Sequence, residues 1–170
     1  MVYIIADECR RVELVPAMVR VIVKYGLRHG QVYTTSGTQA VAIWLGPDET
    51  APDDVKMAEA GMDEVAQLWG GEAVERFNRL VGTIDHQHMR LMHGPHYHLF
   101  FLGTAPEAQG KGAATALIES FLSEHNDLPC CLETLTPQNV EFYRKRGFRV
   151  AGETDVPESD VQVWTMVRGA

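Results

Sequence analysis

The chain begins with hydrophobic residues at helical spacing. Between positions 7 and 29 the apolar side chains recur every three to four residues: Leu14, Met18, Val21 and Tyr25. This pattern predicts an amphipathic helix that ends near Gly30. Two short runs rich in β-branched and aromatic residues follow, QVYTT and QAVAIWL, separated by SGT. They predict a β-hairpin, because small polar residues favour the tight turn between two strands.

The middle of the chain returns to a helical pattern between positions 53 and 92. We expect breaks at Gly61, at Gly70-Gly71 and also at Gly82, because glycine weakens a helix interior. The run HYHLFFLGT, residues 96–104, is almost uninterrupted in its apolar and aromatic character. It predicts a strand that is buried on both faces of a sheet.

The last third alternates between helical and strand patterns. An apolar stripe from Ala113 to Leu122 predicts a helix, and LPCCLETL predicts a buried strand. Thr136-Pro137 is typical of a helix start and Gly147 of a helix end. FRVAGE and VQVWTMV then read as the last strands. This order favours an α/β (α+β) fold with at least one parallel strand pair, in a single domain over residues 1–170.

Composition narrows the class of function. The chain has 170 residues and a formal net charge of −8, which disfavours a nucleic-acid or anionic-membrane surface. No apolar run reaches the length of a membrane span, and no signal peptide is recognisable. The cysteines are Cys9, Cys130 and Cys131; an odd number with two neighbours in an apolar run favours reduced thiols in a cytoplasmic protein.

The stretch TAPEAQGKGAATALIESF, residues 104–121, joins a predicted strand to a predicted helix through a Gly-Lys-Gly loop. Such loops often bind phosphate groups through backbone N–H groups at a helix N-terminus. A Walker loop requires glycine where Ala105 stands and serine or threonine where Gly112 stands. The dinucleotide fingerprint is also poorly matched, since Thr115 occupies its third glycine position.

The spacing that does fit is Gln/Arg-x-x-Gly-x-Gly/Ala, satisfied by Gln109, Gly112 and Ala114. A second block, LETLTPQNVEFYRKRGFRVAGE, carries Asn139 and Tyr143 at i and i+4 on one face of a predicted helix. With these two blocks the chain resembles the GNAT superfamily of acyl-CoA-dependent N-acetyltransferases. The upstream segments are similar to the branch that contains puromycin N-acetyltransferase.

The resemblance implies a mixed central sheet flanked by helices and acetyl-CoA as co-substrate, with no metal. It implies a coenzyme-binding half at about residues 95–168 and an acceptor side at about residues 1–94. The residues implied to bind the coenzyme are Leu102, Gly103, Thr104, Gln109, Gly110, Lys111, Gly112, Ala113, Ala114, Asn139 and Tyr143.

The reaction implied is attack of an amine on the thioester carbon of acetyl-CoA. The resemblance assigns the oxyanion to backbone N–H groups near Leu102–Thr104 and protonation of the departing thiolate to Tyr143. Glu133, His98 and His96 are the candidate bases for the ammonium proton, and ordered water is a further alternative. Glu133 stands in an apolar strand, where a carboxylate needs a partner or a function; His98 could equally be a hydrogen-bonded core residue.

Five of the seven histidines lie between positions 86 and 98, which raises the question of a zinc site. Their spacings match no tight ligand pattern, no cysteine stands nearby in sequence, and Gly94-Pro95 interrupts the segment. We therefore expect no metal. The residues are interpreted as a helix end and a loop before the strand, with some histidines in the acceptor cleft.

The acceptor cannot be identified from the sequence beyond a small-molecule amine. Members of the family usually carry a strand and a helix before the region that matches residues 7–29, and that unit is not found here. A second subunit could cover the sheet edge, so a homodimer is one expectation. The alternative function is a non-catalytic acyl-CoA-binding or sensor domain of the same fold.

Overall fold

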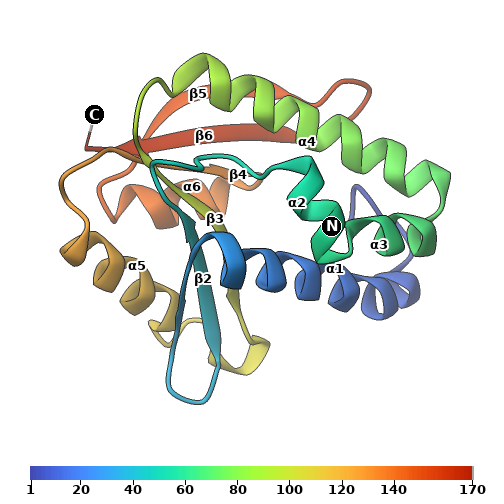
Figure 1. Ribbon diagram of the computed structural model, residues 1–170, viewed down its shortest axis with the longest axis horizontal. Helices are drawn as coiled ribbons and strands as arrows, with labels where there is room; N and C mark the ends of the chain where they lie inside the picture. The colour runs from blue at the N-terminus through green and yellow to red at the C-terminus, as the bar shows by residue number, and fades with distance from the viewer. Residues whose placement is uncertain (170) are drawn as a thin grey trace.

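The strand patterns assemble into one six-stranded mixed sheet (Figure 1) in a computed structural model that describes residues 1–169. The strand order is β1-β2-β3-β4-β6-β5. Only β3 and β4 run parallel; the other neighbouring strands are antiparallel. This confirms the predicted mixed sheet and its parallel pair. The strands are β1 (Gln31–Thr34), β2 (Ala40–Leu45), β3 (Tyr97–Thr104), β4 (Cys130–Thr134), β5 (Arg149–Asp155) and β6 (Gln162–Arg168).

Helices cover both faces of the sheet, and each face has its own hydrophobic core (Figure 1). On one face, α5 (Ala113–Glu124) and α6 (Pro137–Arg144) pack over a core that contains Trp44, Phe121 and Met166. On the other face the core contains Tyr25, Trp69 and Val163. The helices on that second face are α1 (Glu8–His29), α2 (Asp54–Ala60), α3 (Met62–Trp69) and α4 (Gly71–Leu91). A short 3-10 turn, η1 (Pro106–Ala108), follows β3.

Several predicted helix boundaries are confirmed. Asp7 caps α1, its carboxylate accepting a hydrogen bond from the backbone N–H of Arg10 at 2.8 Å. Thr136 caps α6 in the same way, with Pro137 at the first helical position. Gly61 and Gly70 end α2 and α3 in conformations with positive φ that favour glycine.

The expected break at Gly82 is wrong, because α4 continues through it. A single glycine weakens a helix by only about 1 kcal/mol. Burial of Ala73 and Leu80 on the inner side of α4 offsets that cost. As a result α4 reaches as far as Leu91, which places His88 in its last turn, beside the start of β3.

Two irregularities open the sheet at its centre. In β3, Phe101 is opposite Ile43 and Leu99 is opposite Trp44, so Phe100 forms a bulge without a partner in β2. On its other edge, β3 pairs with β4 only at Tyr97 and His98. The strands diverge beyond this point. Burial on both faces, predicted for the whole of 96–104, therefore holds at the start of β3, and the side chains from Phe100 onward are half-buried.

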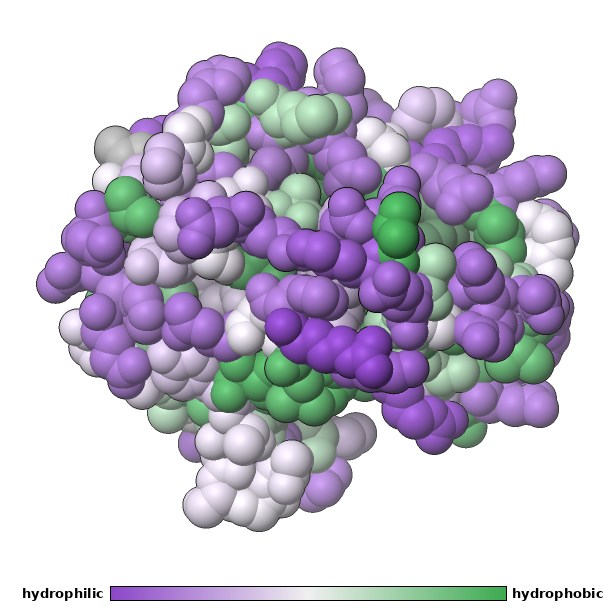
Figure 2. Space-filling view, viewed as in Figure 1, coloured by the Kyte–Doolittle hydropathy of each residue, from purple (hydrophilic) through white to green (hydrophobic). Residues whose placement is uncertain are grey.

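The surface seen in Figure 2 is mostly hydrophilic, with apolar side chains gathered below α1 over the lower part of β2 and β3. The hollow between α1 and this end of the sheet is lined by Val12, Val15, Val41 and Phe101, among others. None of the helices within residues 1–169 has both the length and the apolar character that crossing a membrane requires.

Candidate active site

A cavity of about 590 Å³ lies where β3, the 104–115 loop and helix start, and α6 meet. All of the predicted coenzyme-binding residues line it except Gly103 and Lys111. Gly103 instead borders the hollow below α1, and the Lys111 side chain is exposed to solvent. The two sequence blocks, some thirty residues apart in the chain, therefore come together around one space.

The loop before α5 presents free backbone donors to this cavity. Gly110 and Gly112 have φ of 73° and 86°, so the backbone turns twice through the left-handed region that glycine favours. Gly112 caps α5 without any side-chain hydrogen bond, and Ala116 is the first residue to bond back, to the Gly112 carbonyl. The N–H groups of the first turn thus lack helical partners and lie at the positive end of the helix dipole.

Tyr143 projects from α6 into the same cavity. It is buried, and burial raises the pKa of its phenol to about 12, with Arg146 acting in the opposite direction. The phenol therefore stays protonated at neutral pH and can donate a proton or a hydrogen bond.

Arg146 is a cavity residue that the sequence analysis did not select. Its guanidinium lies 3.5 Å above the ring of Phe142 and donates to the Phe142 carbonyl and to the Thr115 hydroxyl. Its Nε is buried and has no hydrogen-bond partner among residues 1–169. A fixed cation in the cavity lining suits an anionic ligand. Arg146 is the last of three consecutive basic residues, Arg144, Lys145 and Arg146, and the sequence alone does not show which of them faces the cavity.

A second cavity, of about 240 Å³, opens onto β3 from the face covered by α1, α2 and α4. Its lining includes His98, Leu99 and Phe100 of β3, whereas Leu102 and Thr104 line the first cavity. The two spaces thus border adjacent parts of β3, which beyond His98 has lost its pairing with β4. Glu133 of β4 also lines the second cavity.

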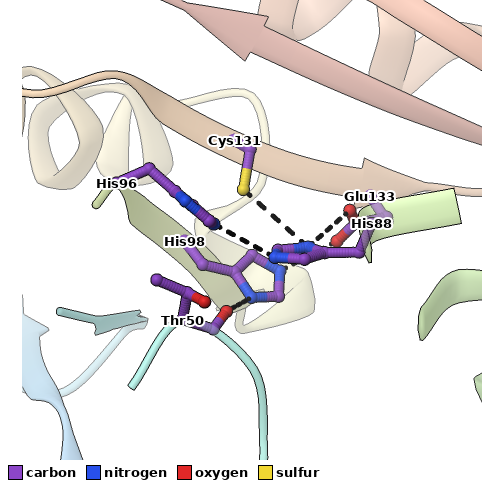
Figure 3. Close-up of polar contacts among 6 residues, drawn as sticks. All are labelled: Thr50, His88, His96, His98, Cys131 and Glu133. Atoms are coloured by element: carbon purple, nitrogen blue, oxygen red, sulfur yellow. Dashed lines mark hydrogen bonds and ion pairs between the residues drawn. The ribbon is translucent and has the colours of Figure 1, made fainter. Parts of the chain in front are cut away.

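At the end of this second cavity, Glu133 lies between two histidines (Figure 3). His98 Nε2 is 2.8 Å from Glu133 Oε2, and His88 Nδ1 is 3.2 Å from Glu133 Oε1. His88 Nε2 is in turn 3.1 Å from His96 Nε2. All four side chains are buried. We call His98, Glu133, His88 and His96 the His–Glu chain.

Both ends of the His–Glu chain stop at backbone carbonyl groups. His98 Nδ1 is 2.8 Å from the Thr50 oxygen, and His96 Nδ1 is 2.8 Å from the Gly94 oxygen. A carbonyl oxygen can only accept, so both Nδ1 atoms carry a proton. A neutral His96 then accepts at Nε2 from a proton on His88 Nε2.

With these protons assigned, each of the two contacts between Glu133 and a histidine still needs a proton to become a hydrogen bond. Three neutral imidazoles and an ionised carboxylate supply no proton to either contact, because each imidazole has already used its own. One added proton makes the His–Glu chain neutral overall, and a second gives it a net charge of +1. The chain can therefore take up one proton on passing from its neutral to its fully hydrogen-bonded form.

The shorter contact identifies where the first added proton lies. Burial alone would lower the pKa of His98, but the Glu133 carboxylate outweighs it and raises that pKa. Burial would likewise raise the pKa of Glu133, yet His98 and His88 lower it to about 2. Burial lowers the pKa of His96. The neutral form is thus a His98 imidazolium with a Glu133 carboxylate, and the vacant proton position lies between Glu133 and His88.

Cys131 completes this group from the neighbouring position in β4. Its Sγ is 4.0 Å from His88 Nδ1, within reach of a weak S–H hydrogen bond. Burial raises the pKa of the Cys131 thiol well above its usual value, so it stays a thiol and a poor nucleophile.

The same side chains have the composition of a transition-metal site. The ligand atoms of His88, His98, Cys131 and Glu133 all lie within 4.8 Å of one another. A metal ion would have to displace the hydrogen bonds between Glu133 and the two imidazoles and to ionise a thiol whose pKa is raised. We interpret the contacts as hydrogen bonds, which satisfy both ends of the His–Glu chain.

The structure thus separates the three predicted base candidates. Glu133 and His98 line the second cavity, whereas His96 lies behind His88 and does not. His88 was not proposed as a base from the sequence. The histidine segment does include a helix end and a loop, as expected, but its residues are brought together with Cys131 and Glu133 by the parallel pairing of β3 and β4.

Comparisons with known proteins agree with this fold. The model of the Acetyltransferase (GNAT) domain family matches residues 66–150. The structure of histone acetyltransferase HPA2 and related acetyltransferase from Corynebacterium glutamicum is similar with a TM-score of 0.56 at 17% identity, over 98% of this chain and 85% of that chain. Chaetomium thermophilum Naa20, in complex with a bisubstrate analogue, gives a TM-score of 0.51 at 14% identity, over 86% and 70% of the two chains. At these identities the two structures show the fold alone, and the puromycin N-acetyltransferase branch stays a prediction.

Proposed function

Because the chain belongs to the GNAT acetyltransferase family and is an acyltransferase, we propose that it transfers the acetyl group of acetyl-CoA to the amine of a small molecule. The observation that carries this proposal is the pair of cavities on adjacent parts of β3, at the point where its pairing with β4 ends. The first cavity has hydrogen-bond donors that suit a pyrophosphate, and the second has the His–Glu chain, which can accept a proton. Direct attack then needs no acetylated enzyme.

The first cavity would hold acetyl-CoA. Backbone N–H groups of the 110–115 turn and the cation of Arg146 match the charge of a pyrophosphate. Leu102 and Thr104 follow the bulge, where backbone N–H groups free of β4 could stabilise the thioester oxygen as it becomes an oxyanion. This arrangement brings the acetyl group to the opening between β3 and β4.

Protons must leave the amine on one side of that opening and reach the sulfur on the other. An ammonium must lose a proton before its nitrogen can attack the thioester carbon, and the nitrogen loses a second when the amide forms. The C–S bond breaks as the new N–C bond is completed, and the sulfur leaves as a thiolate. Tyr143 would protonate that thiolate and regain a proton from the nitrogen, so that one proton per turnover reaches solvent.

The His–Glu chain would take the first of these protons. In its neutral form it has one vacant position, between Glu133 and His88, and both residues line the second cavity. Filling it completes the row of hydrogen bonds from Thr50 to Gly94. His98 keeps Glu133 ionised and in place, so the proton comes to rest on His88, which His96 orients. Of the candidates from the sequence, this favours Glu133 as the group that receives the amine's proton and passes it to His88, with His98 as its partner.

The proposal predicts amine-dependent release of coenzyme A. With acetyl-CoA and a panel of primary amines, a thiol reagent will detect free coenzyme A in proportion to acetylated product identified by mass spectrometry. Calorimetry will show that acetyl-CoA binds in the absence of amine. Binding without turnover of any amine would favour a non-catalytic acyl-CoA-binding protein, and failure to bind would exclude both functions.

A further inference from the structure

The chemistry of the second cavity restricts the acceptor. Apart from the His–Glu chain and two aspartates, its lining is almost wholly apolar: Met18, Ile22, Ala51, Pro52, Met57, Met62, Phe77, Val81, Ile84, Leu99 and Phe100. These side chains come from α1, the loop before α2, α2, α3, α4 and β3, so the apolar wall surrounds the space on several sides. Such a wall favours an apolar body and rejects hydroxyl groups, which would lose their hydrogen bonds to water.

Apart from the histidines, every ionisable side chain that lines this cavity is acidic. Asp54, at the start of α2, is exposed, Asp85 of α4 is half-buried, and Glu133 lies deepest. Within residues 1–169, no lysine or arginine lines the cavity. Burial raises the pKa of Asp85, with the charge of Asp54 acting in the same direction, so a cation beside Asp85 would relieve its unfavourable position. A carboxylate there would meet Asp85, while the charges of His98 and Glu133 already pair with each other.

The size of the space favours a compact occupant. Its volume of about 240 Å³ is less than half that of the first cavity, about 590 Å³. Such a space suits a single aromatic or cyclic group with a short arm to its nitrogen better than a polycationic aminosugar or a peptide.

We propose that the second cavity is an acceptor site for compact monoamines with an apolar body, whose ammonium approaches Glu133 past Asp85. This inference rests on the acetyltransferase function proposed above and names its substrate class. Asp85 acts as a binding residue: it attracts the ammonium and repels amines that also carry a carboxylate. The acceptor's apolar group occupies the space between Phe77, Ile84 and Phe100.

Two matched pairs of acceptors test the proposal. 2-Phenylethylamine and phenylalanine share an amine and a ring and differ by a carboxylate, while cyclohexylamine and glucosamine differ mainly by hydroxyl groups and the ring oxygen. We expect kcat/KM to be at least about 100-fold higher for the apolar member of each pair. Phenylalaninamide, which lacks the carboxylate, should recover part of the loss and so separate charge from size.

A variant of Asp85 tests the residue that gives the preference. Asp85→Asn should raise KM for 2-phenylethylamine about tenfold or more, change kcat much less, and narrow the gap between 2-phenylethylamine and phenylalanine. Asp160→Asn, which removes an exposed carboxylate from a loop outside the cavity, is the matched control and should change neither value. An Asp85→Asn protein with an unchanged preference would overturn the role of Asp85.

The outcomes distinguish this inference from the function on which it rests. Faster turnover of phenylalanine, glucosamine or a peptide would overturn the acceptor class and leave acetyl transfer standing. If no amine is turned over, the proposed function fails. Calorimetry of 2-phenylethylamine with the coenzyme A-bound protein then decides whether the second cavity binds apolar amines. Binding that weakens in Asp85→Asn would support the cavity's chemistry, and absence of binding would overturn it.

Discussion

Replacing Glu133 by glutamine will lower kcat/KM for acetyl transfer by roughly 10²–10⁴-fold, the usual contribution of a general base, and leave the affinity for acetyl-CoA nearly unchanged. Glutamine keeps the size of the side chain, but it removes the charge that holds His98 protonated and the position that receives the amine's proton. The coenzyme cavity does not include Glu133. Stopped assays across a range of amine concentrations, with calorimetry of acetyl-CoA, measure both quantities.

The same variant has a predicted pH signature. In the native protein only the neutral His–Glu chain can accept a proton, so kcat should rise with pH as the chain loses its excess proton. The excess proton lies between Glu133 and His88, where the charge of the carboxylate favours it. Glutamine removes that charge, so the chain loses its excess proton at lower pH, and the acidic limb of the kcat profile should move to lower pH in Glu133→Gln.

The matched control for this prediction is Glu124→Gln, which removes an exposed carboxylate at the end of α5 that accepts a hydrogen bond from Tyr33. It should retain native kinetics. A Glu133→Gln protein with native kcat and a native pH profile would show that ordered water, rather than the His–Glu chain, removes the proton.

Replacing Tyr143 by phenylalanine will lower kcat by roughly 10²–10⁴-fold, because the departing thiolate loses its proton donor. Tyr143 lines the first cavity, and its pKa of about 12 keeps the phenol protonated at every pH at which the protein is expected to work. Burial raises that pKa and the charge of Arg146 lowers it. Phenylalanine preserves the packing against Phe142 and Phe148.

Separate effects on kcat and on the KM for acetyl-CoA distinguish a proton donor from a residue that only maintains the structure. Loss of a proton donor should reduce kcat with little change in the KM for acetyl-CoA, whereas a damaged cavity would raise that KM. Tyr33→Phe, which removes an exposed hydroxyl from β1, is the control and should behave as the native protein. If Tyr143→Phe turns over at the native rate, another group or water protonates the thiolate.

Features with short-range causes could be predicted from the sequence. The helix of residues 8–29, the hairpin and the cap at Thr136 follow from local spacing and side-chain chemistry. Two motifs are each recognisable within a few residues: the loop from Gln109 to Ala114 and the Asn139–Tyr143 pair. Apart from Lys111, the residues of the loop line the first cavity, as do Asn139 and Tyr143. A cavity built from such blocks is accessible to sequence reasoning.

The features that the sequence did not reveal depend on contacts between distant segments. Glu133 and His88 are 45 residues apart, and they meet because α4 runs through Gly82 while β3 pairs briefly with β4. The bulge at Phe100 depends on the register with β2, which no local pattern specifies. For the same reason, the spacing of the histidines in the sequence does not show that three of them interact. Their contacts run from His98 through Glu133 to His88 and His96, which is not their order along the chain.

The most direct test of the account is the initial-rate pattern with acetyl-CoA and an apolar amine varied together, read beside the intact mass of the protein. Direct transfer between two cavities predicts intersecting reciprocal plots and a protein mass unchanged by acetyl-CoA alone. Parallel plots with an acetylated protein would contradict it and would indicate a covalent intermediate.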